Sequence, residues 1–328
     1  MRFIVTGGSG FVGTNLIKKL AELYPEIKIY NLDIRFENNY VSKNIVNYKC
    51  DITKETELQN FNFLNDDIIF HLAANIFNEE TPYISKRKEF FEKMNVHGTE
   101  NLLNVLKRDN VKKIVFLSTC MVYGTPKKKL IKTDHQLKPN GPYGSSKLKA
   151  ENLILKFGEE NDSKCLIYRA SIIAGPGRMG LLKKLSFLIK NNLPVPMIGT
   201  GKNRYQMISV HDCVEALINF IKLGYPTGIY NLGSKNPPTV RVLLKSLIKS
   251  SGSKSVLIPT WPYGIKKILY LLDLLNMTLL YPEQYLLAQH EFVLDIEDLE
   301  NELDFKPVYQ DEDLLLESYL SILNNQST

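Results

Sequence analysis

The chain has 328 residues, 44% hydrophobic and 23% charged, which is usual for a folded globular protein and excludes a disordered one. Its formal net charge of +6 is mild and forms no basic stripe, so no nucleic-acid partner is expected. The cysteines form no CxxC pair and no metal-like spacing, which predicts free thiols, no disulfide and no metal; they are Cys50, Cys120, Cys165 and Cys213.

The first half of the chain alternates short β-branched runs with helical patterns. The chain opens directly on a strand, MRFIVTGG, without a charged leader or an apolar signal segment, so a cytoplasmic protein is expected. Helical periodicity covers residues 14–24, 86–107 and the segment after Tyr143. This alternation is typical of βαβ units and a parallel sheet. The expected strands are RFIVTG, KIYNLD, IVNYKCD, IIFHLAA, KIVFLST and CLIYRASII.

The character of the chain changes after the sixth strand, which ends in GPG at residues 175–177. Proline-punctuated segments such as NNLPVPMIG and IPTWPYG then break the alternation, as expected for a smaller second lobe. Residues 204–234 again resemble core elements. We therefore predict an α/β fold: a Rossmann-like, doubly wound parallel sheet over residues 1–174, and a smaller, interleaved C-terminal lobe over 175–328.

The most apolar stretch is IKKILYLLDLLNMTLL, residues 265–280. It is only sixteen residues long and carries Lys266, Lys267 and Asp273, whereas a membrane span needs roughly twenty apolar residues. No membrane span is expected. We interpret the stretch as a helix covering a ligand cleft, with contact to a membrane surface as the less favoured alternative.

TGGSGFVG, residues 6–13, follows the first strand and opens a helix. Gly8, Gly10 and Gly13 satisfy G-x-G-x-x-G, and Gly7, Gly10 and Gly13 satisfy the alternative G-x-x-G-x-x-G spacing. Glycines let the backbone approach a pyrophosphate, whose charge is met by the N–H groups that open the helix. We expect a dinucleotide to be bound here by Gly7, Gly10, Phe11, Val12 and Gly13.

Asp33 stands at the end of the second strand, twenty residues after Gly13. A carboxylate in this place accepts hydrogen bonds from a ribose diol and repels a 2′-phosphate, so the predicted cofactor is NAD rather than NADP. Arg35, two residues further on, would weaken that discrimination.

Tyr143 and Lys147 are four residues apart in GPYGSSKLKAE, which places them on one face of a helix beginning near Pro142. An ammonium near a phenol favours the phenolate, so a lowered tyrosine pKa is expected. A phenolate beside an oxidised nicotinamide can deprotonate a substrate hydroxyl as hydride leaves its carbon.

At this point the sequence resembles the extended short-chain dehydrogenase/reductase family of NAD-dependent nucleotide-sugar epimerases and dehydratases, together with their hydroxysteroid-type relatives. The resemblance covers nearly the whole chain through TGGSGFVG, Asp33, CDIT, HLAA, NVHGT, STCMVYG, YGSSK and DIEDLENELDFKP. It implies that Tyr143, Lys147 and Thr119 are catalytic. Further cofactor contacts implied by position are Asp51 and Ile52 at the adenine, Leu72, Ala73 and Ala74 at the pyrophosphate and ribose, Asn95 bracing the site, and Ser118. His71 is interpreted as a satisfied core histidine.

The sequence departs from the family pattern after Thr119. Sugar 4,6-dehydratases resemble Thr-Asp-Glu there, because eliminating water needs an acid and a base, whereas this chain has Cys120 and Met121. Methionine transfers no proton, which disfavours an ordinary 4,6-dehydratase. Cys120 is a candidate acid/base if its thiol pKa is lowered, and otherwise a small apolar residue that packs the pocket wall, the alternative we favour.

Two further departures concern the substrate. Nucleotide-sugar enzymes resemble R-x-x-N after the sixth strand, the Asn binding a diphosphate, whereas Ile172 stands here in a segment similar to hydroxysteroid and flavonol reductases. The arginine motif before the strand near Met207 is one residue shorter than in the family. Ser171, Arg204 and Thr119 are the candidate substrate contacts.

The expected function is a nucleotide-sugar epimerase or dehydratase that works through a transient 4-keto sugar and recycles its bound NAD, on a UDP- or dTDP-linked substrate. The rival is an NAD(P)-dependent oxidoreductase acting on a hydrophobic alcohol, and a minor alternative is a non-catalytic NAD sensor. A homodimer is expected from the family and from the helical segments at 86–107 and after Tyr143.

Overall fold

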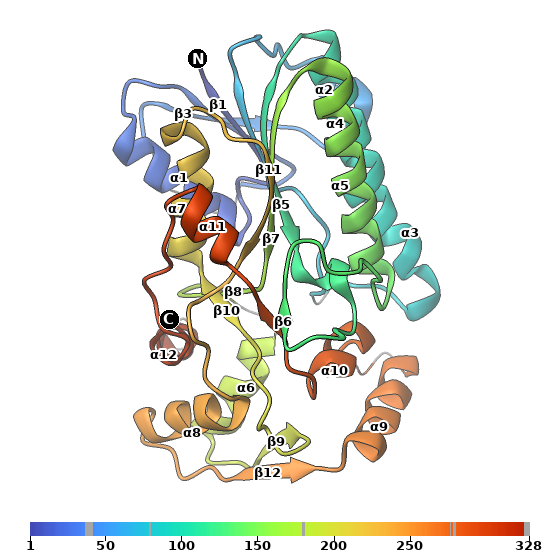
Figure 1. Cartoon of the computed structure of the whole chain (residues 1–328), viewed down its shortest axis with the longest axis vertical. Helices are drawn as coiled ribbons and strands as arrows, with labels where there is room; N and C mark the ends of the chain where they lie inside the picture. The colour runs from blue at the N-terminus through green and yellow to red at the C-terminus, as the bar shows by residue number, and fades with distance from the viewer. Residues whose placement is uncertain (37–41, 79, 179–180, 276, 278–279, 325–328) are drawn as a thin grey trace.

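The computed structural model describes residues 1–36, 42–78, 80–178, 181–275, 277 and 280–324. Its centre is a seven-stranded parallel sheet with the strand order β11-β7-β5-β4-β1-β2-β3 (Figure 1). The order reverses between β1 and β4, and ligands of such sheets bind at the carboxyl ends of the strands beside this point. The predicted α/β Rossmann-like fold is confirmed. The strands are β1 (Phe3–Thr6), β2 (Ile29–Asp33), β3 (Ile45–Lys49), β4 (Ile68–His71), β5 (Lys113–Thr119), β7 (Lys164–Ala170) and β11 (Gly228–Leu232).

Both faces of the sheet are covered by helices, which explains why its central strands are apolar on both sides. All four residues of β1 and of β4 are buried. One face packs against α1 (Phe11–Leu23), α7 (Val210–Lys222) and α11 (Glu297–Glu302). The other face packs against α2 (Glu55–Gln59), α4 (Gly98–Arg108) and α5 (Pro142–Asn161). Figure 1 shows these two helical layers to the left and right of the sheet.

The helical pattern predicted over residues 86–107 is present but interrupted. It comprises η1 (Ile84–Lys86), α3 (Arg87–Glu92), the π-helical turn η2 (Lys93–His97) and α4. A π-turn adds a residue to the helix and is frequent at functional sites. Here the turn contains Asn95, whose side chain is buried.

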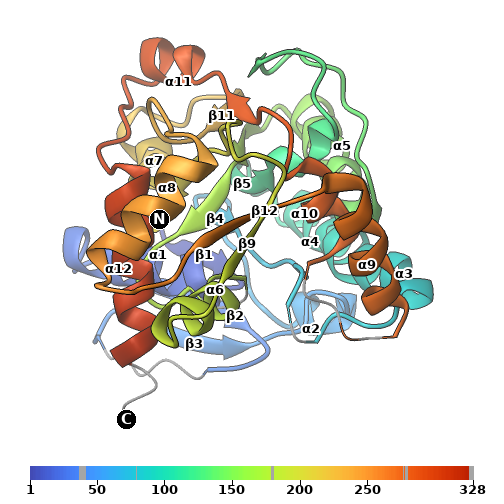
Figure 2. The ribbon, with the colours of Figure 1, turned by 90° about the horizontal axis from the view of Figure 1, so that it is seen from below.

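The C-terminal lobe lies beyond one end of the sheet, at the bottom of Figure 1. Figure 2 shows that β9 and β12 run through its centre, with α6, α8 and α12 on one side and α9 and α10 on the other. Short parallel pairs, β8 with β10, β9 with β12 and β6 with β13, connect segments far apart in the sequence. The bounds are η3 (Cys120–Tyr123), β6 (Leu130–Ile131), β8 (Ile172–Ala174), α6 (Leu181–Lys190), β9 (Val195–Ile198), β10 (Met207–Ser209), α8 (Val240–Ser250), β12 (Leu257–Thr260), α9 (Pro262–Leu274), α10 (Pro282–Leu287), β13 (Val293–Leu294) and α12 (Asp311–Asn324).

The apolar stretch at residues 265–280 is helical as far as α9 extends, and residues 276, 278 and 279 lie outside the described ranges. Within α9 only Leu269 and Asp273 are buried, and an apolar face is exposed on the other side. The helix packs against α3 through an Arg87–Asp273 ion pair. In the ranges that the structure describes, no helix has the length and apolarity needed to cross a bilayer.

Candidate active site

The glycine-rich loop between β1 and α1 is shaped by two close backbone approaches. Gly7 has a φ of +70°, and a Cβ at this position would lie 2.6 Å from Ala73 Cα. A Cβ on Gly13 would lie 2.4 Å from the Gly7 oxygen. Gly10 precedes α1 as its N-cap, and no side chain caps the helix, so the N–H groups of its first turn face the loop unblocked. An anionic group such as a pyrophosphate fits this cradle.

Asp33 ends β2 directly beside this loop. Its Oδ2 accepts a hydrogen bond from Ser9 N at 2.9 Å, and its Oδ1 accepts one from Ile34 N at 2.7 Å. A carboxylate accepts about four hydrogen bonds, so it retains capacity for a ribose hydroxyl. The Arg35 guanidinium pairs with Glu80 at 2.9 Å. Glu80 neutralises part of the positive charge with which Arg35 would otherwise attract a 2′-phosphate. The residues present therefore fit a dinucleotide with a free ribose diol.

The other cofactor contacts implied by the sequence follow neighbouring strands. Asp51 and Ile52 come after β3, and residues 72–74 come after β4, so the sheet brings both segments to the edge where the glycine loop lies. Asp51 Oδ1 accepts a hydrogen bond from the Thr53 hydroxyl at 2.8 Å, and Ile52 is buried in the core on the α4 side.

His71 is the core histidine that the sequence indicated. Its Nδ1 lies 2.7 Å from the Thr6 hydroxyl and its Nε2 lies 2.9 Å from the Thr99 hydroxyl, so both ring nitrogens have partners. Burial, and then the charge of Lys147, lowers the pKa of the ring to about 3. The imidazole is therefore neutral and hydrogen-bonded through both nitrogens, and its role is to stabilise the core.

Thr119 and Tyr143 are brought together from a strand end and a helix start. Thr119 is the last residue of β5, and Tyr143 is the second residue of α5. The Thr119 side chain lies close enough to the Tyr143 phenol to lower its pKa. These two hydroxyls form a pair able to hold one substrate oxygen, which is the geometry expected of a tyrosine acid/base.

The pKa of Tyr143 differs from the sequence-based expectation. Burial raises it to about 12, and the Thr119 side chain only partly offsets this. The expected lowering of this pKa is wrong for the protein alone, because burial is the largest influence on the phenol. Lys147 Nζ donates to the Leu117 carbonyl at 2.8 Å and lies 4.0 Å from the centroid of the Phe116 ring.

Lys147 is a buried cation, and its titration gives a stability test. Burial lowers its pKa from 10.5 to about 7, against the opposing charge of Glu151. Between these values the unfolded chain binds a proton that the folded protein releases, so the free energy of unfolding rises with pH.

Lys147→Met removes the free-energy cost of burying the ammonium charge. We therefore expect the variant to be more stable than the wild type when no cofactor is bound, with the largest gain at pH 7 and below. The gain should shrink by about 1.4 kcal/mol per pH unit from about pH 7 to about pH 10. Denaturant unfolding across this range measures the gain. The exposed Lys149, which pairs with Glu92, supplies the control: Lys149→Met should give a difference that does not change with pH. A flat difference for Lys147→Met would contradict the buried charge.

Asn95 braces the catalytic helix. Its Nδ2 donates to Ser146 Oγ at 2.9 Å, and the Ser146 hydroxyl donates in turn to the Tyr143 carbonyl at 2.8 Å. Its Oδ1 accepts from Asn75 N at 2.7 Å. The π-turn η2 directs this side chain toward the first turn of α5. The Asn95 contacts therefore help to fix the position of Tyr143.

A second support for α5 comes from Glu283 in α10, which the sequence analysis missed. The carboxylate is buried, with Oε1 accepting from Tyr143 N and Oε2 accepting from Gly144 N, both at 2.9 Å. A carboxylate at a helix N-terminus meets orphan N–H groups and the positive end of the helix dipole. Burial nevertheless raises its pKa. Its partners are 139 and 140 residues away in the chain, and no local pattern marks such a contact.

Ser118 is tied to a buried ion pair. Its hydroxyl donates to Glu151, and Arg169 Nη2 pairs with Glu151 Oε2 at 2.8 Å. Arg169 Nη1 also donates to the Tyr123 hydroxyl at 3.1 Å. This network joins β5, α5 and β7. Within it the Ser118 hydroxyl donates its hydrogen bond to Glu151.

Cys120 does not have the lowered pKa that an acid/base role requires. Burial raises its thiol pKa to about 12, so the less favoured alternative, a reactive thiolate, does not hold for the protein alone. Cys120 is 2% exposed and packs in an apolar cluster with Ile131, Leu287 and Phe292. All four cysteines are buried free thiols. In the described residues, no three His, Cys, Asp or Glu side chains gather into a possible metal site.

The candidate substrate residues differ in their availability. Ser171 lies between β7 and β8, and its Oγ is buried without a hydrogen-bond partner in the described structure. Arg204 pairs with Glu291, and its side chain is 41% exposed. Arg178, which the sequence analysis missed, stacks over the Phe11 ring at 5.4 Å and interacts electrostatically with Tyr143.

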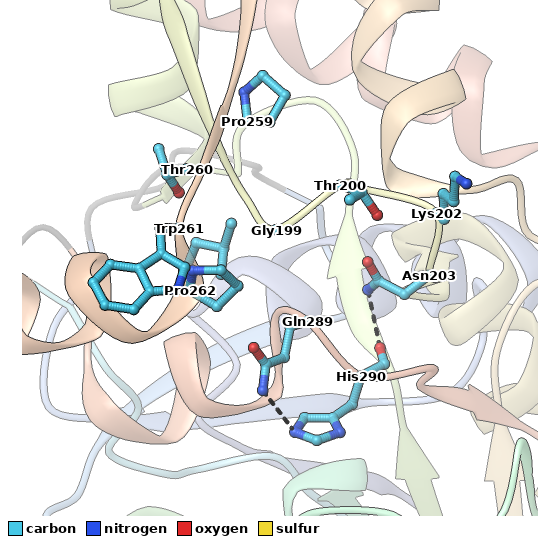
Figure 3. A pocket seen from close by; sticks show the side chains of 11 residues that line it. Gly199, Thr200, Lys202, Asn203, Pro259, Thr260, Trp261, Pro262, Gln289 and His290 are labelled. Atoms are coloured by element: carbon cyan, nitrogen blue, oxygen red, sulfur yellow. Dashed lines mark hydrogen bonds between the residues drawn. The ribbon is translucent and has the colours of Figure 1, made fainter.

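A surface pocket of about 640 Å³ lies in the C-terminal lobe at the carboxyl ends of β9 and β12 (Figure 3). Asn203 anchors the segment beneath it by donating to the carbonyls of Ala288 and His290, at 3.1 and 2.9 Å. Thr119, Tyr143 and Lys147 do not line this pocket, so it is separate from the reacting groups. The lining includes Gly199, Thr200, Lys202, Trp261, Gln289 and His290.

Comparisons with known proteins agree with this geometry. The model of the NAD dependent epimerase/dehydratase family matches residues 3–233. A dTDP-D-glucose 4,6-dehydratase of Bos taurus is 31% identical over 267 residues, which cover 76% of this chain and 72% of that protein. An uncharacterized protein of Sinorhizobium fredii, y4nG, is 26% identical over 319 residues, covering 96% of this chain and 77% of that one.

Solved structures share the fold. The dTDP-glucose 4,6-dehydratase of Bacillus anthracis in complex with NAD has a TM-score of 0.76 at 22% identity, covering 100% of this chain and 98% of that one. The UDP-glucuronic acid 4-epimerase of Bacillus cereus, in complex with UDP-glucuronic acid and NAD, has a TM-score of 0.79 at 20% identity, covering 99% and 100%. With the glycine cradle, Asp33 and the Thr119–Tyr143 pair, these matches establish that the chain belongs to the NAD dependent epimerase/dehydratase family and is an NAD-dependent enzyme.

Proposed function

We propose that this enzyme is a nucleotide-sugar epimerase or dehydratase that oxidises a sugar hydroxyl at C4 and returns the hydride within the same turnover. The observation that carries the proposal is that the end of β5 and the start of α5 place Thr119 and Tyr143 next to each other, beside the dinucleotide cradle. The names of the relatives, a dTDP-D-glucose 4,6-dehydratase and a UDP-glucuronic acid 4-epimerase, support the substrate class.

In this proposal NAD, bound by the glycine loop, Asp33, Asp51, Ile52 and residues 72–74, supplies a nicotinamide that accepts hydride. Tyr143 takes the proton of the C4 hydroxyl, and Thr119 orients that oxygen. Lys147 holds the ribose and, once charged, favours the phenolate. Residues 1–174, with the returns at 204–234 and at α11, form the cofactor domain, and most of the remainder of 175–328 forms the substrate lobe.

The substrate diphosphate is proposed to bind Arg178. No acidic side chain pairs with this guanidinium in the described residues, and Ile172, which stands in place of the family's Asn, cannot donate a hydrogen bond. Burial lowers the pKa of Arg178 because the charge lacks a partner, and a bound anion would supply one. The orphan Ser171 hydroxyl is a second proposed contact.

Arg178→Gln is therefore expected to raise KM for the nucleotide sugar about 10- to 100-fold, because a hydrogen bond to a charged group contributes about 1.5 to 3 kcal/mol. The Kd for NAD should change little. Arg204→Gln is the matched control, since that arginine already has Glu291 as its partner. A larger KM effect at Arg204 than at Arg178 would reverse the assignment.

A net oxidoreductase on a hydrophobic alcohol is the second candidate. Ile172 and the exposed apolar face of α9 favour it. Consumption of free NAD in proportion to product would identify this activity, because an epimerase recycles its cofactor. An NAD sensor without chemistry has no need of the Thr119–Tyr143 pair, so we do not propose one.

A homodimer through α4 and α5 is the proposed assembly. In the described structure these helices carry no large apolar side chain on the exposed surface, so this contact would be polar. Sedimentation at increasing ionic strength tests it, since a polar contact weakens with salt.

The experiment that tests the reaction is mass spectrometry of UDP-, dTDP-, GDP- and CDP-sugars after incubation with the enzyme and NAD. A product lighter by one water identifies a dehydratase and requires a proton donor such as Cys120. Conversion at unchanged mass identifies an epimerase in which Cys120 only packs. Unchanged sugars throughout the panel would overturn the proposal in favour of the hydrophobic alcohol.

A further inference from the structure

Among the described helices, α9 carries the largest group of exposed apolar side chains. Along α9 and its C-cap, six large side chains are between 46% and 61% exposed. On the surfaces of soluble proteins such residues normally occur singly, and a contiguous patch of them indicates an interaction site. We call this set the apolar face of α9: Tyr263, Ile268, Tyr270, Leu271, Leu274 and Leu275.

The orientation of α9 is fixed, so its apolar face cannot turn inward. Leu269 and Asp273, one turn apart, are its buried residues, and the Asp273 carboxylate receives both terminal nitrogens of Arg87, at 2.6 and 2.7 Å. Removing one partner of a buried ion pair is strongly destabilising, so rotating the helix out of this contact is unfavourable. Figures 1 and 2 place α9 at the outer edge of the lobe, next to α3.

The exposed charges that α9 itself carries have one sign. Lys266 and Lys267 are its flanking ionisable groups, and Lys267 Nζ lies 4.5 Å from the centre of the Tyr263 ring. Asp273 is the one acidic residue of α9, and it is buried and paired. A second copy docking by two-fold symmetry would bring lysines against lysines, whereas an anionic surface would neutralise them.

We propose that the apolar face of α9 docks the enzyme onto an anionic lipid surface. Leucine and isoleucine side chains would enter the boundary between headgroups and acyl chains, tyrosines would lie at headgroup level, and the lysines would contact lipid phosphates. The proposal rests on the fold and on these exposed residues, and it holds whichever sugar reaction the enzyme performs.

The test is co-sedimentation of the full-length protein with phosphatidylcholine vesicles with and without phosphatidylglycerol. We expect binding to the anionic vesicles that weakens as salt rises. The double variant Leu271→Glu and Leu275→Glu should lose binding, and Lys267→Glu should weaken it at least about fivefold, since one lysine near an anionic membrane contributes about 1 kcal/mol.

The matched control is Leu64→Glu, which charges a side chain that is 40% exposed in the cofactor domain and should leave binding unchanged. All variants should keep the wild-type melting temperature within a few degrees, because exposed substitutions cost little. Equal vesicle binding by the double variant would overturn the proposal. So would no vesicle binding accompanied by self-association that Leu271→Glu abolishes, because the face would then be an interface between two copies.

Discussion

Tyr143→Phe is expected to lower kcat about 100- to 10,000-fold, the contribution of a positioned general acid/base, while the Kd for NAD stays nearly unchanged. The phenol is the group that exchanges a proton with the sugar hydroxyl in the proposed reaction, and the Thr119 side chain lies beside it. Phenylalanine preserves the packing of the ring against Phe77 and Phe91, at centroid distances of 5.7 and 5.5 Å.

Single-turnover assays and NAD titration by fluorescence separate the two effects. Tyr83→Phe is the control, because that side chain is 57% exposed and should leave both quantities at wild-type values. Near-normal turnover in Tyr143→Phe would remove Tyr143 from the mechanism. Loss of NAD binding together with turnover would indicate a structural role instead.

Sequence patterns predicted the parts of this site that are built locally. The glycine loop depends on spacing within eight residues, and Thr119 and Asp33 stand at strand ends that periodicity locates. Because all strands are parallel, each strand end reaches the same edge of the sheet. The fold and the cofactor cradle therefore followed from residues 6–13, Asp33 and the alternation of strands and helices.

The pKa values of the site residues could not be predicted from the spacing of residues in the sequence. Tyr143 and Lys147 share a helix face, but burial dominates both groups and pushes their pKa values in opposite directions, to about 12 and about 7. For Cys120 the sequence left open a thiol pKa lowered by nearby cations, and burial raises that pKa instead. Desolvation depends on the complete packing around a group, which one segment of sequence does not contain.

Contacts between the two lobes also could not be predicted from the sequence. Glu283 and Arg178 belong to segments that the sequence analysis assigned to the C-terminal lobe, and each meets the cofactor domain only after the chain has folded. Glu151 lies on the same helix as Tyr143, yet its partners Ser118 and Arg169 come from two separate strands. The residues that adjust the site are thus the ones whose partners are distant in the chain.

Glu283→Ala is expected to destabilise the protein and to lower kcat more than it raises KM. The substitution leaves the N–H groups of Tyr143 and Gly144 buried without an acceptor, at a cost of about 1 to 3 kcal/mol for each. It also frees the first turn of α5, and a displacement of about 1 Å at Tyr143 would lower kcat by about 100-fold. Since Glu283 touches the Tyr143 backbone and not its hydroxyl, we describe it as a positioning residue.

Three variants distinguish positioning from a general loss of stability. Glu283→Gln retains one acceptor oxygen and should recover part of both kcat and the free energy of unfolding. Glu300→Ala breaks the more exposed pair with Lys235, away from α5, and should cost at most about 1 kcal/mol, without affecting kcat. If Glu283→Ala unfolds more easily but keeps wild-type kcat at a temperature where it is folded, α5 is held by Asn95 and Ser146 alone. If kcat falls in the folded variant and Glu283→Gln restores it, the C-terminal lobe sets the position of the catalytic tyrosine.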